Sequence, residues 1–286
     1  IAEADESDGT IIKFKPHIGL ITNLELDHTN HYTNINSLIK TMKKFSSNSE
    51  KIVANYDCKI VKDNFKSAIW WSTKTTHGVE FAAIPYSVTG DRTNASYYEK
   101  GELIGEISFP IPGLHNLSNL TGALAACRLS GIPFNKLNKY ISQLKNPIRR
   151  FEFKGIWNDR QIVDDYAHHP SEIKATLSMA RLMINSKTSI LPKTPLRVIS
   201  VFQPHRFSRT RDFLEDFAKS LQESDVVILA PIYDAGESAI NGISSKILAK
   251  YINQINPLLS IFVANNFIHL IELIKINTQA GDLILN

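Results

Sequence analysis

The chain has 286 residues, of which 43% are hydrophobic and 21% are charged. These fractions are ordinary for globular proteins and exclude a collagen, a coiled coil or a disordered chain. At about 100–200 residues per domain, the length predicts two domains. The net charge of +4 is small, so we expect no nucleic-acid partner, although scattered basic residues could hold a small acidic substrate.

The cysteines, the apolar runs and the chain ends allow predictions about the cellular compartment and the completeness of the chain. Cys58 and Cys127 lie far apart and form no metal-type pair, so we expect reduced thiols and a cytoplasmic protein. No apolar run reaches the ~18 residues of a membrane span, and no signal peptide precedes the acidic start, so we expect no membrane partner. The chain starts at Ile1 rather than Met and ends on GDLILN, so we expect a fragment. The oligomeric state stays open.

The first half of the chain is predicted as an α/β domain. Apolar runs predict strands at 18–24, 51–55 and 68–71. One apolar face, Ile35, Leu38, Ile39, Met42 and Phe45, predicts a helix over 34–47. Alternating residues between Gly, Asp and Asn turns predict an antiparallel sheet over 79–109. Further helices are predicted from His115 and over 133–144, followed by a linker at 145–147.

The second half is predicted as a Rossmann-like domain with a mostly parallel sheet. Its β-branched runs start roughly 25–35 residues apart with helical patterns between them, which is typical of βαβ units. Strands are predicted at 161–165, 197–202, 225–231, 259–264 and 282–285. Helices are predicted at 171–184, 209–222, 243–254 and 267–276. Ligands bind beyond the carboxyl ends of such strands, so DDYAHHP, QPHRFSRTR and YDAGE are the expected binding loops.

Two motifs near the start of the chain could hold a metal. EADESD places four acids within six residues, and they repel each other unless solvent or a cation relieves them. This motif is either a solvated turn or a site for a hard cation such as Mg²⁺. His28 and His31 have the spacing of metal ligands, but structural histidines explain such a pair at least as often.

Three further motifs offer groups for nucleotide and carboxylate binding. Asn116 and Asn119 lie on the first turn of a predicted helix, where amides suit a purine edge, and helix capping is the alternative for Asn116. Arg150 in RRFE could clamp a phosphate or form a surface ion pair. Arg206 and Arg209 lie three apart, so they face the same side of a helical turn and can bind a carboxylate or phosphate.

DDYAHHP combines two acids and two histidines on one turn between a strand and a helix. Its polar residues are Asp164, Asp165, Tyr166, His168 and His169. Packing does not explain such a group, so we expect a functional role for at least one of them. Pro170 fits the first position of the helix that follows.

The motifs occur in one order, EADESD, TNLELDH, HNLSN, RRFE, DDYAHHP and FQPHRFSRT, and this order resembles the Mur ligase family. The residues of these motifs are most similar to those of the family members that add L-alanine to UDP-N-acetylmuramate. Members that recycle the murein tripeptide usually carry EADEYD, so Ser7 favours the alanine-adding branch. The resemblance implies an α/β fold with a truncated central ATP-binding domain at 1–147. A Rossmann-like ligase domain at 148–286 is expected to follow it and to be truncated at its C-terminal end.

The resemblance also implies a reaction and a set of site residues. ATP would phosphorylate the muramoyl carboxylate, and the amine of L-alanine would attack the acyl phosphate, with Mg²⁺ in two sites. The implied Mg²⁺ ligands are Glu3 and His28. The implied adenine contacts are His115, Asn116 and Asn119, and Arg150 and Asp165 match contacts to the phosphates and ribose. The amino acid and muramoyl carboxylate would be held by Tyr166, His168, Arg206 and Arg209. Structural or supporting roles are expected for Asp5, His31 and His169.

The sequence departs from the family pattern at two points, because the N-terminal UDP-binding domain and the phosphate loop of the central domain are missing. The family's Gly-rich phosphate loop ends in Lys-Thr, and no GK[ST] sequence occurs here. We therefore predict no ligase turnover by these 286 residues alone. Alternatives are a metal-dependent hydrolase using Asp27/His28 and Asp165/His168, or a non-catalytic domain that keeps only binding surfaces. Within the family interpretation, Ala variants of Arg206 and Arg209 should lose activity far more than stability, because exposed Arg truncations cost little.

Overall fold

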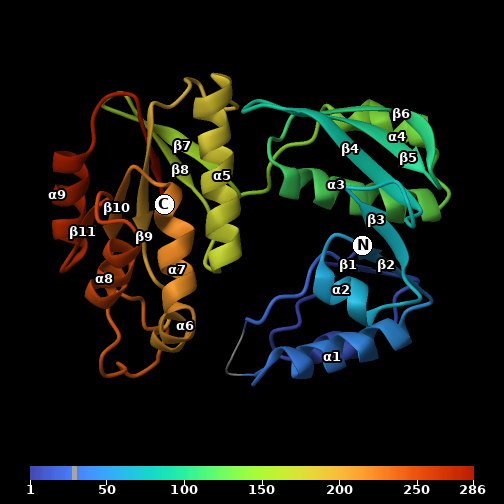
Figure 1. The fold of residues 1–286 in the computed structure, drawn as a ribbon, viewed down its shortest axis with the longest axis horizontal. Helices are drawn as coiled ribbons and strands as arrows, with labels where there is room; N and C mark the ends of the chain where they lie inside the picture. Colours follow the sequence, from blue (N-terminus) through green and yellow to red (C-terminus); the bar gives the residue numbers. More distant parts are fainter. Residues whose placement is uncertain (28–30) are drawn as a thin grey trace. The chain divides into compact units, whose positions relative to one another are not determined.

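The computed structural model describes residues 1–27 and 31–286, which form two compact units (Figure 1). Unit 1 comprises Ile1–Val88 and Arg92–Leu144. Unit 2 comprises Thr89–Asp91 and Lys145–Asn286. Both units are α/β, as the sequence predicts.

Unit 1 contains a six-stranded sheet whose strands follow one another in chain order. β1 to β4 pair in parallel, and β4, β5 and β6 pair antiparallel. The strands are β1 (Ile18–Ile21), β2 (Lys51–Asn55), β3 (Ile69–Ser72), β4 (Phe81–Val88), β5 (Thr93–Glu99) and β6 (Glu102–Phe109). The predicted antiparallel region therefore extends the parallel sheet and is continuous with it.

Helices cover both faces of the sheet of unit 1. Alternate residues of β2 show this: Ile52 and Ala54 join a core with α1 and α2, whereas Val53 joins a core with α3 and α4. The helices are α1 (Ile35–Asn48), α2 (Lys59–Asn64), α3 (Leu114–Leu129) and α4 (Phe134–Ile141), with a 3-10 turn η1 (Thr10–Lys13) before β1. Asn34 caps α1 by accepting a hydrogen bond from the Ser37 backbone N–H at 3.1 Å, which explains why the helix begins there.

A glycine allows α3 to approach the sheet closely. A Cβ atom at Gly122 would lie 2.9 Å from the indole of Trp71, which is fully buried on β3. Such a contact is too short for any side chain, so α3 can lie this near β3 only because residue 122 is glycine. The close approach packs the middle of α3 directly on β3.

Unit 2 contains a second six-stranded sheet, in the order β11-β10-β9-β12-β8-β7. All neighbouring strands are parallel except β7 and β8, which form an antiparallel hairpin. The strands are β7 (Glu152–Trp157), β8 (Arg160–Asp164), β9 (Arg197–Phe202), β10 (Val226–Leu229), β11 (Ser260–Val263) and β12 (Asp282–Leu285). Each parallel strand agrees with a predicted run to within a few residues, whereas β7 was not predicted.

The strand order explains where the helices of unit 2 lie. The connections from β8 to β9, β10 and β11 advance in one direction, so right-handed crossovers place α5, α7 and α8 on one face. The connection from β11 back to β12 reverses, and α9 packs on the other face. The helices are α5 (Pro170–Ser186), α6 (Phe207–Asp212), α7 (Leu214–Ser220), α8 (Ser245–Ile255) and α9 (Phe267–Asn277), with a 3-10 turn η2 (Leu221–Glu223).

The helix predicted over 209–222 is wrong as a single element. The structure breaks it at Phe213, whose backbone leaves the helical region (φ −115°, ψ 21°). The Phe213 ring packs edge-on against His169 and against Phe217. This packing holds the break and separates α6, which follows β9 directly, from α7, which covers the sheet.

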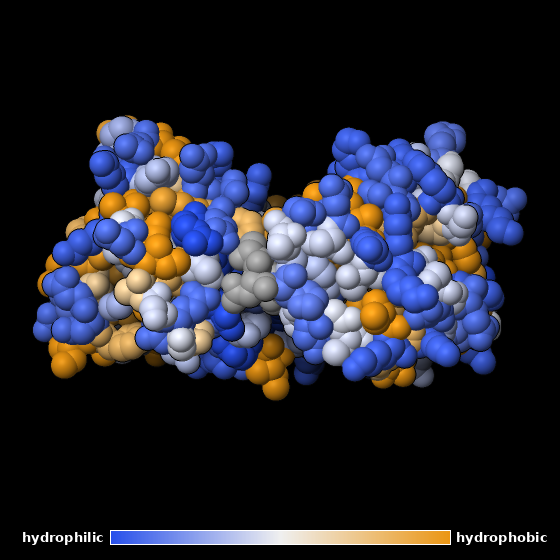
Figure 2. All heavy atoms as spheres, turned by 90° about the horizontal axis from the view of Figure 1, so that it is seen from below, coloured by the Kyte–Doolittle hydropathy of each residue, from blue (hydrophilic) through white to orange (hydrophobic). Residues whose placement is uncertain are grey.

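Hydrophilic side chains cover most of the molecular face shown in Figure 2, with smaller hydrophobic areas between them. The exposed large hydrophobic residues include Leu258, Ile268 and Ile276 in unit 2. Within residues 1–27 and 31–286, no helix has the length and apolar character needed to cross a membrane.

Candidate functional site

Polar side chains from three loops gather at the carboxyl edge of the sheet of unit 2. The loops follow β8, β9 and β10, and His205 in the second loop links them. Its pKa is lowered first by burial and then by the nearby charges of Arg209, Arg206 and His168, while Glu237 acts in the opposite direction. These side chains are therefore close enough to influence one another, at the edge where parallel sheets bind ligands.

The loop after β8 presents Tyr166 and His168 together. Their rings meet edge-on at 5.1 Å between centroids, and Tyr166 is 49% exposed. The guanidinium of Arg149 lies 4.4 Å from the centre of the Tyr166 ring, and that of Arg150 lies 5.9 Å away. Arg150 also approaches Glu172 at 3.7 Å. The predicted residues of RRFE and DDYAHHP thus form one cluster with an accessible aromatic ring and two cations.

Asp165 connects the start of unit 2 to the end of β8. Its two carboxylate oxygens each accept a backbone hydrogen bond at 2.8 Å, one from Phe151 and one from Ala167. Burial raises the pKa of this carboxyl above its usual value, and the two hydrogen bonds act against that rise. The contacts show that Asp165 holds the backbone of this loop, in addition to the nucleotide contact that the resemblance implies.

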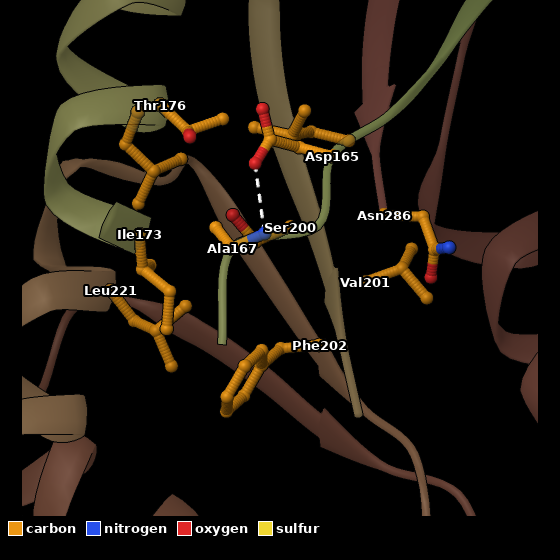
Figure 3. Close-up of a pocket in the computed structure, with 11 residues that line it drawn as sticks. Asp165, Ala167, Ile173, Thr176, Ser200, Val201, Phe202, Leu221 and Asn286 are labelled. Atoms are coloured by element: carbon orange, nitrogen blue, oxygen red, sulfur yellow. Dashed lines mark hydrogen bonds between the residues drawn. The ribbon is translucent and has the colours of Figure 1, made fainter. Parts of the chain in front are cut away.

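A pocket opens beside Asp165 between α5 and the ends of β9 and β12 (Figure 3). Apolar side chains dominate its lining, among them Ile173, Phe202 and Leu221, and Thr176 and Asn286 add polar groups at its sides. The apolar lining is the physical reason that burial raises the pKa of Asp165.

His169 has a structural role at the start of α5. Its Nδ1 lies 3.4 Å from the Ser171 backbone N–H, which donates to it, and Glu172 accepts from the His169 backbone N–H at 3.1 Å. This reciprocal arrangement is a capping box. The structural role expected for His169 is therefore that of a helix cap, which holds the start of α5 at the end of the DDYAHHP turn.

The loop after β9 places Arg206 and Arg209 differently. The Arg206 side chain is 39% exposed, and its backbone has φ 69°, in the left-handed region that few residues other than glycine adopt. Arg209 is only 8% exposed, and its Nη1 lies 3.4 Å from His205 Nδ1. The expectation that both arginines are exposed is therefore wrong for Arg209, whose buried guanidinium packs beside His205 in the loop cluster.

Glu237 is a residue of this cluster that the sequence alone did not single out. It follows β10 in YDAGE, and its carboxylate accepts hydrogen bonds from the backbone N–H of Ser208 at 2.9 Å and the Ser208 hydroxyl at 2.6 Å. Arg206 Nη1 lies 3.5 Å from the same carboxylate. The position of YDAGE after a predicted strand marks this loop as a candidate binding loop. The contact between Glu237 and Ser208 is not predictable from the sequence, because the two residues are 29 positions apart.

In unit 1, the start of α3 carries the residues predicted to contact adenine. Gly113 precedes the helix with φ 101°, and a Cβ atom there would lie 2.9 Å from the imidazole of His115. Asn116 donates from Nδ2 to the Pro112 carbonyl at 2.8 Å. The alternative of helix capping for Asn116 is wrong, because Gly113 is the N-cap of α3 and Asn116 lies inside the helix. Asn119 is exposed. His115 and Asn119 are therefore the accessible polar groups of this turn.

The acidic motif EADESD has local contacts that explain two of its four acids. Asp8 accepts from the backbone and hydroxyl of Thr10 at 2.8 and 2.7 Å, and Asp5 accepts from the Ser7 backbone N–H at 2.5 Å. Glu3 has an exposed side chain. His28, the second implied Mg²⁺ ligand, lies outside the described residues. In the described part of the chain, no group of three or more His, Cys, Asp or Glu side chains has the arrangement of a metal site.

The two cysteines are free thiols in the described structure, and both are half-buried. They lie in α3 and just before α2, both within unit 1. Neither belongs to the clusters described above.

Two family models match the chain, one in each half. Residues 2–127 match the Mur ligase middle domain, and residues 149–286 match the Mur ligase glutamate ligase domain. A UDP-N-acetylmuramate–L-alanine ligase of Parasynechococcus marenigrum is 52% identical over 285 residues. This match covers the whole chain and 61% of the relative, so the chain spans about three fifths of the length of that protein.

Solved structures show the same fold. A crystal structure of UDP-N-acetylmuramate–alanine ligase from Thermotoga maritima has the same fold, with a TM-score of 0.75 and 21% sequence identity. The match covers 98% of the present chain and 58% of the chain in that structure. A MurF ligase from Thermotoga maritima, solved in complex with ADP, also shares the fold, with a TM-score of 0.66 and 14% sequence identity. This match covers 95% of the present chain and 57% of the MurF chain. With two domain models that together match most of its residues, the chain belongs to the Mur ligase family.

Proposed function

We propose that the protein containing this chain is an ATP-dependent ligase that joins L-alanine to UDP-N-acetylmuramate through an acyl phosphate. The observation that carries the proposal is the cluster of Tyr166, His168, Arg206 and Arg209 at the carboxyl edge of the sheet of unit 2. The proposal is supported by the 52% identity to a relative that is named UDP-N-acetylmuramate–L-alanine ligase. The family resemblance of the motifs adds to that support.

The chemistry of the cluster suits two negatively charged substrates. A carboxylate is a poor electrophile until it is activated, and phosphoryl transfer to it develops negative charge on several oxygens. Arg206 and Arg209 provide two guanidinium groups that can hold a carboxylate or the phosphate of the intermediate. Holding the amine and the carbonyl in one site makes their reaction effectively unimolecular, which lowers its barrier by several kcal/mol, roughly 7–11 in well-oriented cases.

The residues assigned to ATP lie in both units. His115 and Asn119, at the start of α3, would hold adenine, with Asn116 fixing the turn through Pro112. Arg150 and Asp165 would contact the phosphates and ribose. A MurF ligase with ADP bound shares this fold, which supports nucleotide binding by the family.

Glu3 fits a role as a Mg²⁺ ligand because it offers an exposed carboxylate, and Mg²⁺ prefers oxygen ligands. When bound, Mg²⁺ would offset the charge of the ATP phosphates. His28 is the proposed ligand of the second ion. Replacing Glu3 with Gln should raise the Mg²⁺ concentration needed for half-maximal activity.

The test is ATP-dependent phosphate release by the full-length protein with UDP-N-acetylmuramate and L-alanine. We expect turnover that depends on all three substrates, and no turnover by the 286 residues alone. The same assay with L-Ala-γ-D-Glu-diaminopimelate replacing L-alanine separates the tripeptide-recycling activity. Turnover with the tripeptide but not with L-alanine would contradict the proposal.

A metal-dependent hydrolase is the alternative from another class. It would need the Asp27/His28 and Asp165/His168 clusters to share one site and no nucleotide. Metal analysis of the purified protein decides between the two, because stoichiometric zinc held without nucleotide would favour the hydrolase.

A further inference from the structure

The carboxylate of Glu237 binds the first turn of α6 at two points. Oε2 accepts from the Ser208 backbone N–H at 2.9 Å, and Oε1 accepts from the Ser208 hydroxyl at 2.6 Å. The Glu237 side chain is 19% exposed. A largely buried carboxylate with two hydrogen bonds to one residue is held firmly, because losing either bond would leave the charge poorly solvated.

The loop that carries Glu237 also controls the backbone just before α6. Arg206 N–H donates to the Tyr233 carbonyl at 2.7 Å, and Tyr233 N–H donates to the Pro204 carbonyl at 2.9 Å. His205 and Tyr233 pair in parallel, and their rings lie 5.3 Å apart. The loop after β10 is therefore joined to the loop after β9 by main-chain and side-chain contacts at consecutive positions.

Arg206 lies between these contacts in a strained conformation. Its φ of 69° costs an ordinary residue free energy, and such strain persists only where surrounding contacts hold it. Its Nη1 lies 3.5 Å from Glu237 Oε1. The same carboxylate thus attracts the guanidinium and anchors the helical turn that begins at the next residue, Phe207.

We propose that Glu237 is a positioning residue: through Ser208 it holds the start of α6, and it thereby places the Arg206 guanidinium for binding a substrate carboxylate. This inference rests on the proposed function and deepens it, because it assigns part of the carboxylate affinity to a residue in a third loop. Without Glu237, the turn would relax toward an unstrained backbone, and the guanidinium would lose a fixed direction.

The experiment uses the full-length protein and varies each carboxylate substrate at saturating concentrations of the others. The variants are Glu237→Ala, Glu237→Gln and Ser208→Ala, together with the double variant Glu237→Ala/Ser208→Ala. Asp212→Ala is the matched control, because it removes a carboxylate that pairs with Arg211 at 2.7 Å on the same short helix. Thermal unfolding of every variant accompanies the kinetics.

We expect Glu237→Ala to raise the KM for one of the two carboxylate substrates about tenfold or more, with a smaller fall in kcat. Ser208→Ala should raise the same KM, and the double variant should be no worse than Glu237→Ala, because both changes break one connection. Glu237→Gln keeps one acceptor oxygen and should fall between Glu237→Ala and the wild type. Asp212→Ala should leave that KM within about twofold of the wild type.

Two results would overturn the inference. One is a KM unchanged in folded Glu237→Ala and Ser208→Ala proteins. The other is an equal rise of KM in Asp212→Ala. If Glu237→Ala does not fold, Ser208→Ala and Glu237→Gln decide the question by the same KM. Failure of the proposed function looks different, because the wild-type protein would then release no phosphate in response to L-alanine.

Discussion

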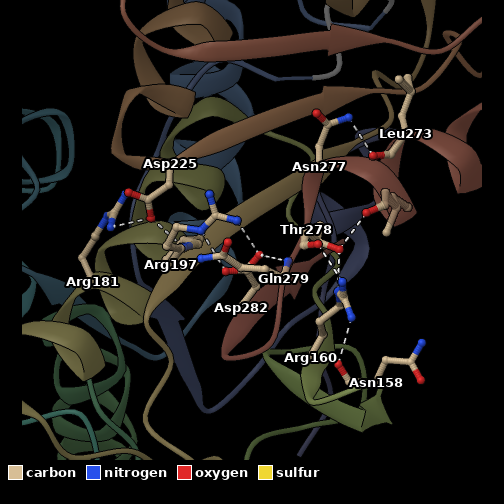
Figure 4. A network of polar contacts seen from close by, with 12 residues as sticks. Asn158, Arg160, Arg181, Arg197, Asp225, Leu273, Asn277, Thr278, Gln279 and Asp282 are labelled. Atoms are coloured by element: carbon tan, nitrogen blue, oxygen red, sulfur yellow. Dashed lines mark hydrogen bonds and ion pairs between the residues drawn. The ribbon is translucent and has the colours of Figure 1, made fainter.

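Arg197 and Asp282 form a two-point ion pair at the first residues of the neighbouring strands β9 and β12. Arg197 Nε lies 2.9 Å from Oδ1 and Nη2 lies 2.7 Å from Oδ2, while Asp282 is completely buried (Figure 4). The Gln279 backbone N–H also donates to Asp282 at 2.7 Å. The pair belongs to a polar network at the amino-terminal edge of the sheet, opposite the candidate site.

Arg197→Met should therefore destabilise unit 2 strongly without acting on the site. Removing the cation leaves a buried carboxylate without its partner, which typically costs about 3–5 kcal/mol. Urea unfolding of the 286-residue chain measures this free energy. Lys193→Met is the control, since its pair with Asp159 at 3.2 Å is exposed and should contribute less than about 1 kcal/mol. Equal losses in the two variants would contradict the role of burial.

Ala variants of Arg206 and Arg209 should differ in what they lose. Arg206 is partly exposed, so Arg206→Ala should lower kcat/KM about 100-fold, as loss of a charge-assisted hydrogen bond predicts, and leave stability nearly unchanged. Arg209 is buried against His205, so Arg209→Ala should lower both activity and the unfolding midpoint. Steady-state kinetics and thermal unfolding of the full-length protein test this. A large stability loss in Arg206→Ala would argue against a binding role.

The two asparagines at the start of α3 should separate nucleotide binding from folding. Asn119→Ala changes an exposed amide and should weaken ATP binding severalfold with no loss of stability. Asn116→Ala removes the bond to the Pro112 carbonyl and should cost about 1 kcal/mol of stability. Calorimetric titration with ATP and urea unfolding give the two quantities. Unchanged ATP affinity in Asn119→Ala would remove this residue from the proposed site.

The lowered pKa of His205 predicts a pH dependence of stability. The folded protein binds this proton less readily than the unfolded chain, whose value is near 6.5. The stabilising contribution of neutral His205 is therefore present above about pH 6.5 and is lost as the pH falls through the lower folded-state pKa.

We expect the unfolding free energy of the wild type to fall more between about pH 7 and pH 5 than that of His205→Gln, which cannot titrate there. Urea unfolding at several pH values measures the difference. His77→Gln changes an exposed histidine of unit 1 and is the control. Parallel pH profiles for the wild type and His205→Gln would show that this histidine does not carry the effect.

The sequence alone predicted the parts of this fold that depend on neighbouring residues. The buried runs Arg197–Phe202 and Asp282–Leu285 are strands with the predicted bounds. The apolar face from Ile35 to Phe45 lies in a helix whose N-cap, Asn34, is visible in the sequence. The order of the motifs was sufficient to predict the family. Residue-by-residue site assignments stay predictions, and His28 lies outside the described residues.

Two features of the fold were not predicted, one with a local cause and one with a non-local cause. The hairpin of β7 and β8 turns at Asn158 and Asp159, which both have positive φ, and this Asn-Asp turn was a readable signal. The break at Phe213 was not readable, because it depends on ring packing against His169, far away in the sequence.

Only the tertiary structure could bring Glu237 to Ser208 and bury Arg209 beside His205. Periodicity and capping act over a few residues and therefore identify helices, strands and the loops that follow them. Which loops meet depends on the strand order, and here β10 lies next to β9, so their carboxyl-end loops touch across 29 residues of chain. The exposure of a charged side chain depends on tertiary packing as well, as the burial of Arg209 shows.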